Sequence, residues 1–301
     1  MTNKARLLTG SILLMAIGLF CFNYYGARAI IQVRGDFVDF LRPVNAGLIP
    51  DTADFPLNYQ DISCKTNDGL TLKGYIVRTD SINQKGTVFL VHGIRAYKEH
   101  FLPVARMLSD SGYNAVLIDL RAHGKSEGKY CTFGYLEKQD LTILIDTILN
   151  EKNLSSDIGI WGQSLGGAVA LQTLAIDDRL KFGIIESSFS DFRITVHDYF
   201  KHFAGFDIPF LTDYLVHRAE KIGSSADQVV PEQSAVNIHQ PVLIVHGNMD
   251  DRINITYGKR NYTNLSGPKE FIELPATHLD VWQVGGEDYF KRVFGFLETI
   301  Q

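Results

Sequence analysis

A serine bracketed by glycines is the feature of this sequence best suited to chemistry. The segment Gly162-Gln163-Ser164-Leu165-Gly166 follows an apolar run at 158–161 and precedes a helix-forming run at 168–174. Glycines on both sides allow close approach of neighbouring backbone, so the serine can occupy a sharp turn between a strand and a helix. The helix N-terminus then directs positive partial charge at whatever the serine attacks. This context predicts that Ser164 is a nucleophile.

Nucleophilic catalysis by serine requires a base that takes up its proton and an acid that orients the base. Asp250 lies just past the apolar run 242–245, where a carboxylate can reach a site from rigidly held backbone, and we predict that it is the acid. Asp251 is the local alternative. His278 is the only histidine after His246, and the order Ser, Asp, His along the chain favours it as the base.

Two backbone amides are expected to stabilise the oxyanion. One is the N–H of Leu165, at the start of the helix after the nucleophile, and the other is the N–H of Ile94, in the loop after a predicted strand at 87–91. His92 in that loop is predicted to be structural. Asp280, two residues after the predicted base, is expected to cap a helix or stabilise its loop.

Short apolar runs alternate with helical patterns through most of the chain. Thr66-Asn67-Asp68-Gly69 predicts a hairpin between strands at 59–65 and 70–78, because Asn, Asp and Gly tolerate positive φ. Further strands are predicted at 87–91, 114–119, 158–161, 182–186, 241–245 and 270–274, and helices at 101–111, 136–150, 165–175, 255–265 and 289–300. The alternation predicts an α/β fold, with a mostly parallel sheet covered on both faces and an antiparallel pair leading into it.

A long segment between the strands that end at 186 and begin at 241 interrupts this alternation. It is rich in aromatic residues, namely Phe189, Phe192, Tyr199, Phe200, Phe203, Phe206, Phe210 and Tyr214. Gly205 and Pro209 break any single helix, so we predict a small helical cap of two or three helices, inserted at about 189–238 over the carboxyl ends of the strands. The alternative is an ordinary crossover with a surface helix.

The first thirty residues have a different character. Lys4 and Arg6 precede a stretch from Leu7 to Ala27 without a charged residue, long enough for a spanning helix of ~20 residues. We predict that residues 1–29 form an uncleaved, single-pass membrane anchor. Ala27-Arg28-Ala29 also fits a signal-peptidase site, so export after cleavage is the alternative.

The charges that flank the apolar stretch bear on its orientation. Lys4 and Arg6 favour a cytoplasmic N-terminus and therefore an extracytoplasmic catalytic domain, whereas Arg28 and Arg34 weaken this bias. Residues 30–58 are interpreted as a connector with a short helix around 31–41.

The composition is that of a globular domain. The chain has 301 residues, 45% hydrophobic and 21% charged, with a formal net charge of −5, so one large α/β domain over residues 59–301 is expected and nucleic-acid binding gains no support. No histidine cluster has metal-ligand spacing and no glycine loop carries a phosphate-binding lysine, so no metal and no cofactor is expected. Cys64 and Cys131 are expected to be reduced, partly buried thiols. The sequence leaves the oligomeric state open.

From about Tyr59 to its end, the chain resembles the α/β-hydrolase superfamily. The resemblance is carried by His92-Gly93, the segment 119–126 (Asp-Leu-Arg-Ala-His-Gly-Lys-Ser), Gly162–Gly167, His246-Gly247-Asn248-Met249-Asp250 and Thr277-His278. It implies Ser164 as nucleophile, Asp250 as acid and His278 as base, and a structural turn at 119–126. Relatives often have a glycine before the histidine, where this chain has Ala276-Thr277. The N-terminal segment and modest cap are similar to the membrane-anchored, single-domain hydrolases of this fold.

The resulting expectation is a serine hydrolase that cleaves a carboxylic ester or thioester through an acyl-enzyme. An aromatic-rich cap beside a bilayer favours an acyl or lipid-like substrate, and hence an esterase or lipase (EC 3.1) over a peptidase (EC 3.4). One alternative is a serine aminopeptidase-like amide hydrolase, for which Glu186 and Asp191 are the candidate acids that would hold a free amine. The other is a catalytically silent hydrolase fold that acts as a binding module.

Overall fold

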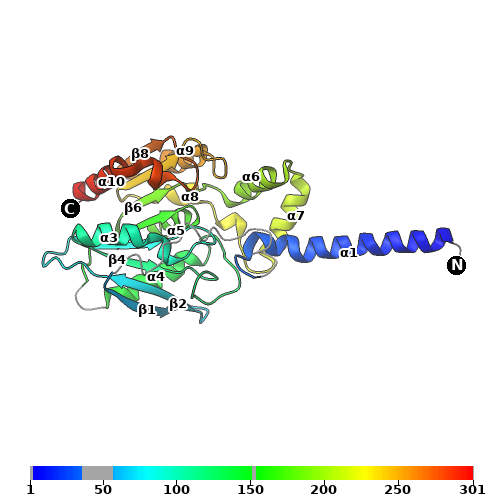
Figure 1. Cartoon of the computed structure of the whole chain (residues 1–301), viewed down its shortest axis with the longest axis horizontal. Coiled ribbons are helices and arrows are strands. Elements are labelled where there is room, and N and C mark those ends of the chain that lie inside the picture. The colour runs from blue at the N-terminus through cyan, green and yellow to red at the C-terminus, as the bar shows by residue number, and fades with distance from the viewer. Residues whose placement is uncertain (1–2, 36–56, 151–153, 301) are drawn as a thin grey trace.

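An eight-stranded sheet forms the centre of the computed structural model, which describes residues 3–35, 57–150 and 154–300 (Figure 1). The strands are β1 (Tyr59–Lys65), β2 (Thr71–Val77), β3 (Gly86–Val91), β4 (Tyr113–Ile118), β5 (Ile158–Gln163), β6 (Leu180–Glu186), β7 (Val242–Gly247) and β8 (Lys269–Leu274). Their order across the sheet is β1-β2-β4-β3-β5-β6-β7-β8. β2 pairs antiparallel with β1 and β4, and all other pairings are parallel. The predicted mostly parallel sheet with a leading hairpin is confirmed.

Helices cover both faces of the sheet because its central strands are apolar on both sides. In β3, Val88 and Leu90 join one buried core, whereas Phe89 and Val91 join the other, as the alternation of side chains along a strand requires. The helices α3 (Leu102–Asp110) and α10 (Val281–Thr299) cover the first face, and α4 (Glu137–Leu149), α5 (Leu165–Leu174), α8 (Pro231–Ala235) and α9 (Ile255–Asn264) cover the second.

Most predicted elements differ from the observed ones by only one or two residues at their ends. The largest difference is at α10, which begins at Val281 instead of residue 289 and contains a kink at Gly286, where φ is 51°. Glycines at 285 and 286 weaken the helical pattern of its first turns, so the sequence predicted only the part after the kink. A short 3₁₀ helix, η3 (Lys98–Phe101), leads into α3.

The segment between β6 and β7 forms two further helices, α6 (Phe192–Ala204) and α7 (Pro209–Glu220), in line with the two or three helices expected there. Gly205 ends α6 in the left-handed conformation, with φ at 76°, and Pro209 begins α7. The 3₁₀ helix η4 (Ala226–Gln228) and α8 complete the segment, and α8 joins the body of the domain.

A single long helix, α1 (Asn3–Ile31), projects from the body (Figure 1). Its residues 11–31 have a mean hydropathy of 1.4 and are long and apolar enough to cross a membrane. The end of α1 is built into the domain, since Ala27 and Ile31 are fully buried. Of the short helix predicted at 31–41, Ile31 is the last residue of α1, residues 32–35 are not helical, and the remainder lies outside the described residues.

The turn after β4 is organised around the buried carboxylate of Asp119. It accepts hydrogen bonds from the ammonium of Lys98 (2.7 Å) and from the backbone N–H groups of Lys98 and Lys125 (2.8 and 2.9 Å). Burial alone would lower the pKa of Lys98, but the hydrogen bond and the charge of Asp119 outweigh burial and raise it. The segment 119–126 is therefore held in place by a buried ion pair, in line with its expected structural role.

We predict that Asp119→Asn destabilises the fold by about 3 kcal/mol, because it leaves the buried Lys98 ammonium without its closest counter-charge. The measurement is the denaturant midpoint of the full chain in detergent micelles. The matched control is Asp110→Asn, which breaks the exposed ion pair with Arg106 and is expected to have little effect. Similar losses in the two variants would contradict a special role for the Asp119 pair.

Candidate active site

Ser164 lies at a sharp turn between β5 and α5. Its φ of 54° and ψ of −116° are rarely adopted by a residue with a side chain. The turn is possible because the residues on either side of Ser164 include glycines, which lack a Cβ. A Cβ added to Gly162 would lie 2.2 Å from the carbonyl oxygen of Gly166, and a Cβ added to Gly166 would lie 1.9 Å from the carbonyl oxygen of Val91. The N–H of Ser164 donates to the carbonyl of Glu186 on β6 (2.8 Å). The backbone thus fixes where the hydroxyl sits.

The structure brings Ser164, His278 and Asp250 together at the carboxyl ends of β5, β7 and β8. Nε2 of His278 lies 2.9 Å from Oγ of Ser164, and Nδ1 lies 2.7 Å from Oδ2 of Asp250. An ionised carboxylate only accepts hydrogen bonds, so Nδ1 carries the ring hydrogen and Nε2 accepts from the serine hydroxyl. All three residues are less than one-tenth exposed, at 8%, 6% and 4% in that order.

Asp250 is held as a carboxylate by several donors. Its Oδ1 accepts from the backbone N–H groups of Arg252 (3.0 Å) and Ile253 (2.8 Å). Burial would raise the pKa of this carboxyl, but hydrogen bonding with His246 and His278 and from the N–H of Ile253 outweighs burial and holds the pKa well below its usual range. The side chain of Asp251, the local alternative, is exposed to solvent.

The loops that carry Asp250 and His278 are tied to one another by their backbones. The N–H groups of Asn248 and Met249 donate to the carbonyls of Leu274 (2.8 Å) and Ala276 (3.0 Å). Asp280 accepts from the N–H of Thr277 (2.6 Å), so it stabilises the histidine loop, one of the two roles expected for it. The imidazole and the carboxylate are therefore positioned by one joined pair of loops.

The loop after β3 runs directly beside Ser164. A Cβ on Gly93 would lie 3.4 Å from Cβ of Ser164, which places this loop, including Ile94, next to the serine. Nδ1 of His92 donates to the carbonyl of Gly93 (2.7 Å), and Nε2 accepts from the N–H of Leu120 (3.1 Å). Burial lowers the pKa of His92, so the ring is neutral and holds the loop, as a structural histidine would.

Sequence reasoning missed a buried network around the carboxylate of Glu186, the last residue of β6. Trp161 (2.8 Å) and Gln163 (3.3 Å) donate to it from β5, and Trp282 (2.9 Å) and the hydroxyl of Tyr289 donate from α10. Burial raises the pKa of Glu186, and these hydrogen bonds oppose that shift. The network connects the strand that precedes Ser164 to the helix that follows the loop of His278.

This network also bears on the acids named for the amide-hydrolase alternative. Glu186 is fully buried among donors, and Asp191 caps α6 by accepting from the N–H of Ile194 (3.0 Å). Both carboxylates already have structural partners. The sequence held only one hint of the network, which is a tryptophan four residues after the histidine.

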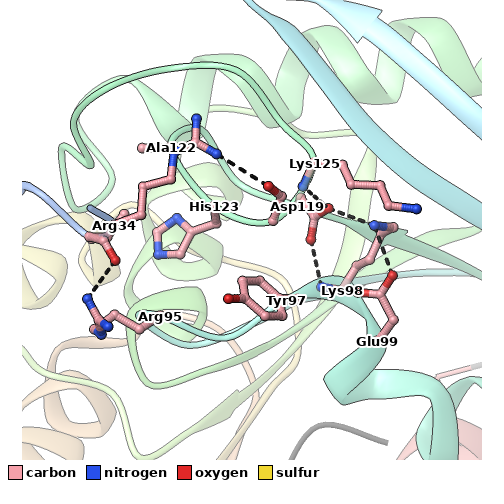
Figure 2. Close-up of a pocket in the computed structure, with 11 residues that line it drawn as sticks. Arg34, Arg95, Tyr97, Lys98, Glu99, Asp119, Ala122, His123 and Lys125 are labelled. Atoms are coloured by element: carbon pink, nitrogen blue, oxygen red, sulfur yellow. Dashed lines mark hydrogen bonds and ion pairs between the residues drawn. The ribbon is translucent and has the colours of Figure 1, made fainter. Parts of the chain in front are cut away.

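A cavity of about 440 Å³ lies beyond Arg95, next to the loop that contains Gly93 and Ile94. Figure 2 shows Arg34, Arg95, His123 and the Lys98–Asp119 pair around it. Arg95 donates to the carbonyl of Val33 (2.7 Å), so this wall of the cavity joins the end of α1 to the β3 loop. The residues that line this cavity do not include Ser164, Asp250 or His278.

The sequence matches the family described as "Serine aminopeptidase, S33" over residues 82–228, a range that contains Ser164 but neither Asp250 nor His278. Among its relatives, this chain is 28% identical to the protein YqkD of Bacillus subtilis over 240 residues, which are 77% of each chain. It is 27% identical to protein bem46 of Schizosaccharomyces pombe, over 83% of this chain and 80% of that one. It is 26% identical to the α/β-hydrolase domain-containing protein WAV2 of Arabidopsis thaliana, over 80% and 79%.

Solved structures of α/β hydrolases also superimpose on this chain. An esterase of Pyrococcus furiosus superimposes with a TM-score of 0.68 and 27% identity, over 83% of this chain and 94% of that one. The α/β hydrolase GrgF of a Penicillium species has the same fold, with a TM-score of 0.65 and 20% identity over 81% and 99%. With its sheet order, its strand–serine–helix turn and these likenesses, the chain belongs to the α/β-hydrolase superfamily.

Proposed function

We propose that the protein is a serine hydrolase that cleaves a carboxylic ester or thioester with an acyl or lipid-like chain. The observation that carries the proposal is the continuous hydrogen-bonded line from Oγ of Ser164 through the ring of His278 to the carboxylate of Asp250. A fold that served only as a binding module would have no need for these three groups in this order.

In this mechanism Oγ of Ser164 attacks the acyl carbon while Nε2 of His278 takes up the hydroxyl proton. The N–H groups of Leu165 and Ile94 bind the oxyanion of the tetrahedral intermediate. The bond to the leaving group then breaks, and Nε2 returns the proton to the departing alcohol or thiol. Water attacks the acyl-enzyme in the second half, gives its proton to Nε2, and releases the carboxylic acid as Ser164 regains its hydrogen.

Asp250 has an electrostatic role in these steps. Its depressed pKa keeps it ionised throughout, so it holds the Nδ1 hydrogen and stabilises the imidazolium that forms when His278 accepts a proton. The N–H groups of Arg252 and Ile253 fix the carboxylate and leave Oδ2 for the histidine.

The substrate class is inferred from what surrounds the site. The esterase of Pyrococcus furiosus provides a likeness in fold and sequence to an ester hydrolase. The cap between β6 and β7 is rich in aromatic side chains, and an apolar helix that could hold the protein in a bilayer packs against it. Both features favour a substrate with an apolar acyl chain.

We also propose that α1 remains attached as a membrane anchor, with the catalytic domain outside the cytoplasm. Cleavage after Ala29 would remove Ala27, which is fully buried, and Asn23, which accepts a hydrogen bond from Tyr214 of α7 (3.1 Å). These contacts make the last turns of the helix part of the folded domain, which favours retention over export of a cleaved chain.

An aminopeptidase-like amide hydrolase is the second candidate, favoured by the description of the family that matches residues 82–228. An enzyme of that kind needs an unpaired carboxylate for the free amine of its substrate. Because Glu186 and Asp191 already accept hydrogen bonds within the fold, the ester or thioester hydrolase is the better-supported function.

We expect Ser164→Ala to lower kcat by about 10³-fold or more, since it removes the nucleophile but leaves the oxyanion donors in place. The purified wild-type chain should also react with a fluorophosphonate probe at Ser164, and the variant should not. Wild-type turnover in the alanine variant, or labelling at another serine, would contradict the assignment.

Asp250→Asn should reduce kcat by about 10⁴-fold, because an amide can donate to Nδ1 and so favours the tautomer in which Nε2 cannot accept from Ser164. Its matched control is Asp251→Asn, one residue away and exposed, which should retain most activity. Steady-state kinetics on one ester substrate compares the two. The assignment of Asp250 as the acid is wrong if Asp251→Asn loses as much kcat as Asp250→Asn, or more.

For the substrate, p-nitrophenyl esters from acetyl to palmitoyl should show kcat/KM rising with chain length, because longer chains bury more apolar surface. Aminoacyl p-nitroanilides with a free amine should be turned over more slowly than esters of the same acyl group. A preference for acetyl would count against a lipid-like substrate, and faster turnover of the anilides would favour the aminopeptidase.

A further inference from the structure

The helix α7 lies along the end of α1, and the pairing of residues sets its direction. Leu215 packs against Gly26, whose added Cβ would lie 2.8 Å from a methyl of Leu215. Asn23, about one turn before Gly26 in α1, accepts a hydrogen bond from Tyr214, the residue before Leu215 in α7 (3.1 Å). Leu19 and Phe22, earlier in α1, border one cavity with Phe210 and Leu211, earlier in α7. Contacts nearer the start of α7 therefore fall nearer the start of α1.

At that end, the two helices border an apolar cavity of about 450 Å³, lined by Leu19, Phe22, Asn23, Phe210, Leu211 and Tyr214. Leu19 precedes Tyr24 by five residues, which is about 8 Å along a helix. Tyr24 and Tyr25 are the aromatic residues expected at the boundary between lipid and water. The start of α7 is thus at or below this boundary, beside the apolar part of α1.

The connection between α6 and α7 exposes large apolar side chains at this level. Phe206 is 61% exposed, Ile208 is 38% exposed and Phe210 is 76% exposed. Tyr214 is 42% exposed, and Phe210 and Tyr214 line the same cavity as Leu19 and Phe22, so this part of α7 continues the exposed apolar surface of α1. We call Phe206, Ile208, Phe210 and Tyr214 the cap tip. Exposed apolar patches of this kind mark interaction sites.

The acidic side chains near the cap tip are paired within the cap. Asp207, the acid within the connection, accepts from Thr212 (2.6 Å) and lies 2.8 Å from Nδ1 of His197. Asp213 pairs with Arg193 and His197 of α6. The exposed Lys201, in the last turn of α6, can reach lipid headgroups.

We propose that the cap tip is a second membrane contact, which inserts into the lipid boundary beside α1. This inference rests on the proposed anchoring by α1 and extends it to the cap over the catalytic domain. Lipid is the occupant that the geometry favours, because the patch continues the apolar surface of α1 at the depth of its aromatic residues. The domain is then held by two elements, and the cap faces the phase in which acyl substrates reside.

The test is tryptophan fluorescence of the full chain in vesicles made of lipids with brominated acyl chains, which quench only tryptophans in contact with them. The fluorescence that the new tryptophan of Phe210→Trp adds to that of Trp161 and Trp282 should be mostly quenched in these vesicles. Ile82→Trp, fully exposed in the loop between β2 and β3, should lose none. Phe20→Trp reports on α1 itself, where Phe20 is 64% exposed.

The outcomes separate the two proposals. Quenching of Phe20→Trp but not of Phe210→Trp would overturn the cap contact and leave the anchor intact, whereas quenching of neither would overturn both. Vesicles that hold at most one copy of the chain exclude coverage by a second copy. If Phe210→Trp is shielded from aqueous iodide only at high protein-to-lipid ratio, without quenching by brominated lipid, the cap tip is a contact between copies and the proposal is wrong.

Discussion

The close approach of backbone segments at the turn that carries Ser164 is the constraint on which the rest of the site depends. The carbonyl of Val91 on β3 occupies the space that a side chain at position 166 would need. Ser164 is consequently held at positive φ, at a cost that the surrounding sheet must offset. The main offset visible at the turn is the pairing of β5 with β3 and β6, which continues to the N–H of Ser164 itself.

Parallel strands make this local constraint useful because they end at the same edge of the sheet. β3, β5, β7 and β8 supply, in turn, the loop beside the serine, the serine, the carboxylate and the imidazole. Glu186 adds a connection between strand and helix, since its carboxylate accepts hydrogen bonds from side chains of both β5 and α10. The positions of Ser164 and of the histidine loop are thereby coupled through one buried carboxylate.

Local sequence patterns were sufficient for the sheet and for the residues that meet at its edge. Apolar runs followed by Gly-x-Ser-x-Gly, by Asp250 and by His278 encode both strand and loop, so order along the chain translated into proximity in space. The network of Glu186 could not be predicted in this way, because its donors come from residues 161, 163, 282 and 289 and depend on tertiary packing. The early start of α10 was missed since two glycines obscure its first turns.

The packing of α1 has a consequence that hydropathy could not reveal. Its residues 11–31 are long and apolar enough to span a membrane, but Ile31 also joins the same core as Leu165, the residue after Ser164. A spanning segment joined to its domain by a loose linker would let the active site turn freely relative to the bilayer. Here the helix enters the core without a break after Ala27, so the direction of α1 and the direction of the sheet edge that carries Ser164 are fixed by the same set of contacts. Under the proposed function, an acyl substrate leaving the bilayer meets the cap in one orientation, which lowers the entropy cost of placing its carbonyl at Ser164.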